Sequence, residues 1–143
     1  HLYRGSRDGH WERLDLDLFQ MCGSGDCCFP GGMVYDPGAG LLFVGCDSSV
    51  MGGKAVLLRS PNADAADPSA LRWEAVTSLS AEVVPGISSA QPLAVDAREP
   101  GTLFVATTSW LSGKARYRVV VSHDDGATWE TLQLSGLPQA PEQ

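Results

Sequence analysis

The sequence predicts an all-β protein built from four-stranded antiparallel units of the kind that form the blades of a β-propeller. The pair Trp-Glu recurs at positions 11–12, 73–74 and 129–130, which marks repeats of about 60 residues. The runs between clusters of Gly, Pro, Asp and Ser are short and rich in Val, Leu, Phe and Tyr, which is typical of strands. No stretch carries the apolar spacing of an amphipathic helix. Four short strands in each repeat indicate propeller blades.

The last two repeats match each other run by run. GLLFVGCDSS at 40–49 corresponds to GTLFVATTSW at 101–110, and GGKAVLLRS at 52–60 corresponds to SGKARYRVVVS at 112–122. In the middle repeat we expect strands at 32–36, 41–47, 55–60 and 72–78. In the last repeat we expect them at 92–96, 102–108, 116–122 and 128–134.

The first repeat contains the sequence of only two strands, at 2–6 and 11–16. The Ala-rich segment 63–71 is interrupted by Pro68 and is expected to be a loop insertion. The chain is therefore predicted to hold half a blade at 1–18, complete blades at 19–78 and 79–134, and a flexible tail at 135–143. Propellers close with about four to eight blades, so two and a half blades cannot close alone.

A motif of the form S-x-D-x-G-x-T-W lies between the third and fourth strands of the last repeat. In such a turn a carboxylate accepts backbone N–H groups, Gly supplies a positive φ and Trp buries its ring, so we interpret the motif as structural. It resembles the Asp box of bacterial-neuraminidase-type (BNR) propellers, which occur in sialidases, sortilin-like receptors and xyloglucan hydrolases. The full motif consists of Ser122, Asp124, Gly126, Thr128 and Trp129; a shortened version consists of Ser6, Asp8, Gly9 and Trp11; and the middle repeat keeps Ser60 and Trp73 without the Asp-x-Gly.

Four cysteines, Cys22, Cys27, Cys28 and Cys46, have a spacing that fits no zinc pattern. We expect two disulfides, Cys22–Cys27 and Cys28–Cys46, with free thiols as the alternative and metal binding as a third interpretation. Disulfides would favour an extracellular or periplasmic location.

Binding residues are expected on the rim opposite the Asp-box turns, where the loops between the second and third strands and between the blades meet. The candidates are Asp47, Lys54, Glu82, Gln91, Trp110 and Lys114. Trp110 beside Lys114 would suit a sugar ring or a protein surface, or it would cover the blade below it. The resemblance to sialidases implies an arginine cluster with a tyrosine nucleophile, but only Arg116 borders this rim. The sequence therefore predicts no catalytic residue, no metal and no cofactor.

The formal net charge of −7 argues against binding to nucleic acid, and no apolar run is long enough to cross a membrane. We expect a non-catalytic propeller segment that acts as a structural or interaction module for a protein or glycan. The alternative is a portion of a glycoside hydrolase, sialidase-like or xyloglucan-hydrolase-like, whose catalytic residues lie mainly outside this chain. The expected partner is another polypeptide, or further copies of this chain, that completes the propeller.

Overall fold

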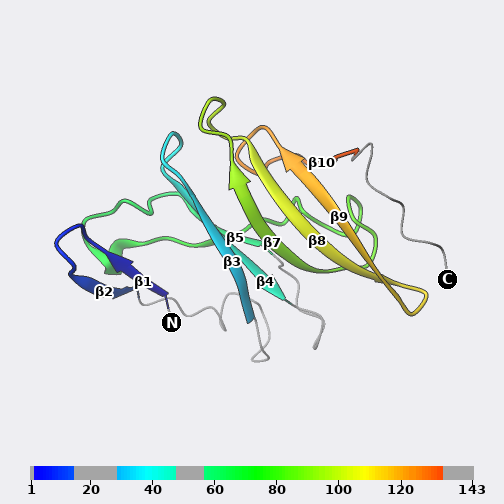
Figure 1. The fold of residues 1–143 in the computed structure, drawn as a ribbon, viewed down its shortest axis with the longest axis horizontal. Coiled ribbons are helices and arrows are strands. Elements are labelled where there is room, and N and C mark those ends of the chain that lie inside the picture. The colour runs from blue at the N-terminus through cyan, green and yellow to red at the C-terminus, as the bar shows by residue number, and fades with distance from the viewer. Residues whose placement is uncertain (1, 15–28, 48–56, 134–143) are drawn as a thin grey trace.

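The computed structural model describes residues 2–14, 29–47 and 57–133, and these residues form an all-β fold (Figure 1). Their one helical element is a short 3₁₀ turn, η1 (Pro68–Ala70), inside the predicted insertion. All pairs of neighbouring strands are antiparallel. The prediction of an all-β protein with antiparallel sheets is therefore confirmed.

The middle repeat forms a four-stranded meander of β3 (Phe29–Asp36), β4 (Leu41–Asp47), β5 (Leu57–Ser60) and β6 (Glu74–Ala75). The strand expected at 41–47 is found with the same bounds, and the one expected at 32–36 begins three residues earlier, at Phe29. The described part of the strand expected at 55–60 forms β5. The expected strand at 72–78 shortens to the two residues of β6. Sequence repetition thus located every strand of this meander.

The last repeat forms a second meander of β7 (Ile87–Val95), β8 (Leu103–Leu111), β9 (Lys114–Ser122) and β10 (Glu130–Thr131). The loop expected at 108–115 is instead a tight turn, because β8 and β9 continue to Leu111 and from Lys114. Ser112 and Gly113 both have positive φ, 53° and 77°, as a two-residue hairpin turn requires. The fourth strand, expected at 128–134, is again only two residues long.

The two strands expected in the first repeat form a separate hairpin of β1 (Leu2–Gly5) and β2 (Trp11–Leu14). In Figure 1 this hairpin lies at the side of the first meander, next to the insertion between β5 and β6. The strand order among the described residues runs from β10 to β6 without returning, so the sheets do not close into a ring.

The two meanders pack against each other and share one apolar core. Phe43 and Leu57 of the first meander lie in it beside Leu103, Val105 and Val120 of the second. Gly45 permits this close approach, because a Cβ atom at this position would lie 2.1 Å from the carbonyl oxygen of Ala90. A single residue pair, Asp47 with Ser89, joins β4 to β7 in the sheet.

The structure corrects the predicted Cys28–Cys46 disulfide. Cys46 is a free thiol with 1% exposure, on the buried strand β4 opposite Pro30. Desolvation by burial raises the pKa of Cys46 to about 11, so the thiol stays protonated at neutral pH. The other three cysteines lie outside the described residues, and with them the predicted Cys22–Cys27 bond.

Candidate functional site

The turn at 122–129, called here the box turn, is organised around one carboxylate. Asp124 accepts hydrogen bonds from the Ser122 hydroxyl at 2.8 Å, from the Thr128 backbone N–H at 2.8 Å and from the Thr128 hydroxyl at 2.6 Å. The hydrogen bonds from Thr128, followed by that from Ser122, lower the pKa of Asp124 from 3.8 to about 2. Gly126 closes the turn with φ of 85°. The Asp124 carboxylate therefore stabilises the conformation of the box turn.

The shortened turn between β1 and β2 repeats this arrangement on a smaller scale. The Ser6 hydroxyl donates to Asp8, and Gly9 has φ of 86°. The hydrogen bond from Ser6 is the main cause that lowers the pKa of Asp8. However, Trp11 does not enter a core here: it is 68% exposed, and its ring lies across Gly5 of the paired strand.

The insertion contains a residue that sequence reasoning missed. Asn62 stands two positions after Ser60, as Asp124 does after Ser122, and its side-chain oxygen accepts from the Ser60 hydroxyl at 3.4 Å and from Arg72 N–H at 2.8 Å. Its side-chain amide donates to the carbonyl of Ala70 at 2.8 Å. The sequence signal that could have identified Asn62 is an Asn or Asp two positions after the serine. Asn62 holds the start of the turn in place although twelve residues separate Ser60 from Trp73.

The box turn joins the second meander to the first. The Arg59 guanidinium donates to the Asp125 carbonyl at 2.8 Å, and the Ser78 hydroxyl donates to the Gly126 carbonyl at 2.5 Å. The Trp129 indole N–H in turn donates to the Ser78 oxygen at 3.0 Å, and its ring packs on the shared core. Through these contacts the box turn holds the two meanders together.

A second joint connects the turns that follow β3 and β7. Asp36, which is 2% exposed, accepts from the Gly101 N–H at 3.0 Å as well as from Gly38 and Ala39 in its own turn. Burial raises the pKa of Asp36, but the three hydrogen bonds from Gly101, Ala39 and Gly38 outweigh this effect and the net shift is downward. Gly101 also accepts from the Asp125 N–H at 3.0 Å, which links both joints.

An arginine–glutamate pair recurs across β5 and β6 and across β1 and β2. Arg59 faces Glu74 across β5 and β6 with Nε and Oε1 3.0 Å apart, and Arg4 faces Glu12 across β1 and β2 with the same two atoms 2.6 Å apart. Each arginine then reaches a turn that follows in the chain, the box turn for Arg59 and the insertion between β5 and β6 for Arg4. Arg59 binds the carbonyl of Asp125, while Arg4 binds the carbonyls of Ala63, Ala65 and Ala66 in the insertion.

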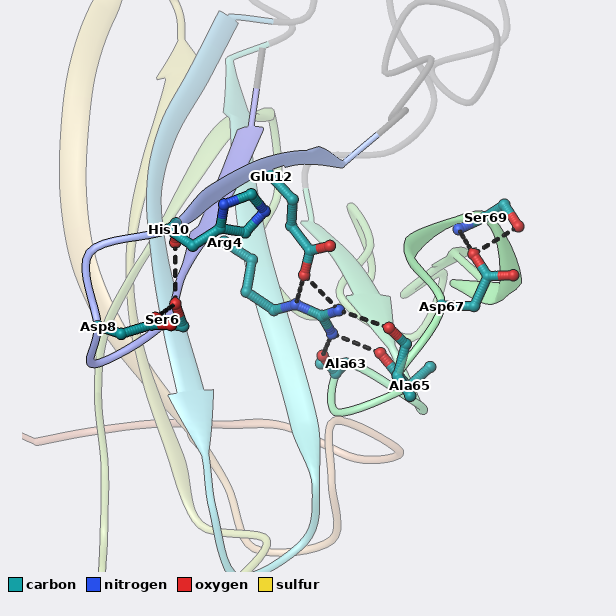
Figure 2. Close-up of polar contacts among 10 residues, drawn as sticks. Arg4, Ser6, Asp8, His10, Glu12, Ala63, Ala65, Asp67 and Ser69 are labelled. Atoms are coloured by element: carbon teal, nitrogen blue, oxygen red, sulfur yellow. Dashed lines mark hydrogen bonds and ion pairs between the residues drawn. The ribbon is translucent and has the colours of Figure 1, made fainter.

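Figure 2 shows how this pair anchors the first hairpin. The Arg4 side chain extends from β1, donates to Glu12 on one side and donates to backbone carbonyls of the insertion on the other. Between the hairpin, the insertion and the first meander lies a cleft with a volume of about 530 Å³. Its lining residues are Tyr3, Arg4, Gly5, Met33, Val34, Tyr35, Leu42, Ala63 and Asp64.

The five predicted rim residues that the structure describes do not line this cleft. Asp47 lies at the end of β4, Glu82 lies in the exposed turn before β7, and Trp110 and Lys114 flank the turn between β8 and β9. Trp110 is 55% exposed, so among the described residues it is not buried as a cover of its meander.

Gln91 was expected in a loop, but it lies inside β7. Its side chain packs over Gly32, where a Cβ atom would lie 3.2 Å from the Gln91 Cγ. The expected strand began one residue later, at Pro92, but pairing with β8 extends β7 back to Ile87. Lys54 lies outside the described residues.

Comparison with models of known protein families and with curated proteins finds no match for this chain. Within residues 2–14, 29–47 and 57–133, no group of three or more His, Cys, Asp or Glu side chains is placed to hold a metal ion. The same residues contain no helix that is long and apolar enough to span a membrane.

Proposed function

We propose that this chain is a non-catalytic β-propeller segment, a structural module that receives another four-stranded sheet on the outer face of its second meander. The observation that carries the proposal is a difference in burial between two phenylalanines at equivalent positions of the two repeats. Phe43 lies on the face of the first meander that accepts the second, and the residue at the matching repeat position is Phe104. Phe43 is 1% exposed, whereas Phe104 is only half-buried and lies outside the core.

The outer face of the second meander, called here the end face, is defined by strand alternation. Along β8 the residues from Leu103 to Ser109 alternate between buried and half-buried, so every second side chain points away from the shared core. The residues of the end face are Phe104, Ala106, Thr108, Trp110, Tyr117 and Val119, paired across β8 and β9. Trp110 and Tyr117 are exposed and the other four are half-buried, while Val121, which pairs with Phe104, is buried. A partly exposed apolar face of this kind marks an interaction surface.

The contacts within the chain indicate what would cover this face. In the first meander, the equivalent face receives an apolar sheet and a box turn from the second. Arg59 clamps that turn from the position opposite Phe43, but the residue opposite Phe104 is Val121. A partner on the end face would therefore be held mainly by apolar contact, without an arginine clamp.

We expect the partner to be another polypeptide or a further copy of this chain that presents a similar sheet. The exposed pair Trp110 and Tyr117 would also suit a glycan ring, which is the second class of partner predicted from sequence. Asp124 and Asp36, carboxylates of the turns between strands, are held by hydrogen bonds within the fold, which favours a module over an enzyme.

Light scattering with an apolar fluorescent dye tests the proposal. We expect the isolated chain either to associate or to bind the dye, and Ala106→Arg on the end face to reduce both. Ala97→Arg, in the exposed turn after β7, is the matched control and should leave both unchanged. A compact monomer that binds no dye, or equal effects of the two variants, would contradict the proposal.

A further inference from the structure

The cleft beside the first hairpin is lined by exposed aromatic and thioether side chains. Tyr3 comes from β1, Tyr35 and Met33 come from β3, and all three are among the exposed large hydrophobic residues of the chain. Tyr35 and Met33 share one face of β3, where Leu42 is the cross-strand neighbour of Tyr35. Two aromatic rings and a thioether thus face solvent within one cleft.

The electrostatics of the cleft favour a cation. Arg4 also lines it, but its guanidinium is occupied by Glu12 and by the carbonyls of Ala63 and Ala65, so its charge is already balanced. Asp64 lines the same cleft and makes no hydrogen bond or ion pair with the other described residues. The net charge of −7 adds a long-range attraction for cations.

The type of cation follows from the hydrogen-bonding groups that the cleft offers. A hydrated metal ion brings many O–H donors, and here the side-chain acceptors are only Asp64 and two tyrosine hydroxyls. A primary ammonium ion has three N–H donors and would need all three of these acceptors at once. A quaternary ammonium ion has no N–H group, and its methyl groups can lie against aromatic and thioether surfaces. Aromatic faces attract such ions through cation–π interaction.

We infer that the cleft binds a small quaternary ammonium ion, with Tyr3 and Tyr35 against its methyl groups and Asp64 as the counter-charge. This site lies on the opposite side of the first meander from the second meander. The inference therefore does not depend on the proposed function of the end face.

Calorimetric or NMR titration with choline tests the inference, and 3,3-dimethylbutan-1-ol, its uncharged isostere, separates charge from shape. We expect choline to bind at least tenfold more tightly than the isostere. Tyr35→Leu should weaken choline binding about tenfold, since it removes one cation–π partner. Asp64→Asn should weaken it and reduce its dependence on salt.

Tyr35→Phe keeps the aromatic ring and should bind choline like the wild type, which separates loss of the ring from loss of folding. Tyr117→Leu, on the end face, is the matched control and should not change binding. The inference is overturned if choline does not bind, if the isostere binds equally well, or if Tyr35→Leu binds choline as the wild type does.

Discussion

Among single residues, Asp124 shows how one side chain sets the shape of a turn and the response of the fold to acid. Its oxygens accept from the Ser122 hydroxyl and from two donors of Thr128. Because these bonds favour the ionised form, the pKa of Asp124 falls to about 2 in the folded chain. A carboxylate in this state contributes stability above its unfolded pKa and loses it as pH falls through the folded value.

We therefore expect the wild-type chain to lose more stability than Asp124→Asn when the pH falls from about 5 to about 2. The measurement is the free energy of unfolding from urea titrations across this pH range. Asp64→Asn, at an exposed carboxylate without a described hydrogen bond, is the control and should keep the wild-type slope. Parallel curves for Asp124→Asn and the wild type would contradict the assignment.

The two tryptophans Trp129 and Trp11 occupy the same motif position in different surroundings. Trp129 packs on the shared core and donates to Ser78, whereas Trp11 is mostly exposed. Trp129→Ala should cost about 3 kcal/mol as a large-to-small change in a partly buried site. Trp11→Ala should cost less than about 1 kcal/mol. Denaturant unfolding of both variants checks the difference, and equal losses would show that burial of the ring is not the cause.

Cys46 should resist alkylation in the folded chain. Burial keeps the thiol protonated, with a pKa of about 11, and also excludes the reagent. At a pH of about 8, iodoacetamide should label Cys46 at least a hundredfold more slowly in native buffer than in denaturant. Peptide mass spectrometry reads out the site. Rapid native labelling would show that β4 opens readily.

Most strands could be predicted from the sequence because the repeats share their apolar spacing and turn residues. What was missed depends on contacts between distant segments. Gln91 became part of a strand because β7 is paired with β8, and Asn62 replaced an aspartate in a turn of different length. The cleft residues Tyr3 and Tyr35 were expected within strands, which is correct, but alternation alone could not indicate that their rings face one hollow.

At the scale of elements, the arginine–glutamate pairs explain how short units are held in place. The hairpin of β1 and β2 has four residues in each strand, and a two-stranded hairpin of this kind is marginal by itself. Arg4 ties it to the insertion through carbonyl groups, in the same way that Arg59 ties the first meander to the box turn. Such hydrogen bonds hold the hairpin in place although it adds no described residue to the apolar core.

We expect Arg4→Ala to detach the hairpin without unfolding the meanders. Hydrogen exchange of residues 2–14 should speed up at least tenfold, while exchange in β8 and β9 should stay unchanged. Arg4→Lys keeps the charge but loses the planar set of donors, so it should give an intermediate rate. Arg7→Ala, at an exposed residue of the same hairpin, is the control. Unchanged exchange in Arg4→Ala would show that the clamp contributes nothing to docking.

For the whole molecule, the central feature is that each meander has two different faces and that the two meanders meet through unlike faces. The first meander buries Phe43 against the second, and its other face carries the buried Val44 and Leu58 beside the cleft. The second meander buries Val105 and leaves Phe104 half-buried at the end face. An interface between unlike faces can continue from one unit to the next until a ring closes. The arrangement is therefore suited to extension by another sheet.

If a further copy covers the end face, association stabilises the folded state by mass action, because unfolded chains cannot form the interface. The Tm should then rise with chain concentration, by several degrees over a hundredfold range if the interface is well populated. Ala106→Arg should abolish this rise, since it places a charge in the centre of the apolar face, and Ala97→Arg should retain it. A Tm that is independent of concentration in the wild type would exclude copies of the chain as the cover of this face and leave another polypeptide as the partner to be sought.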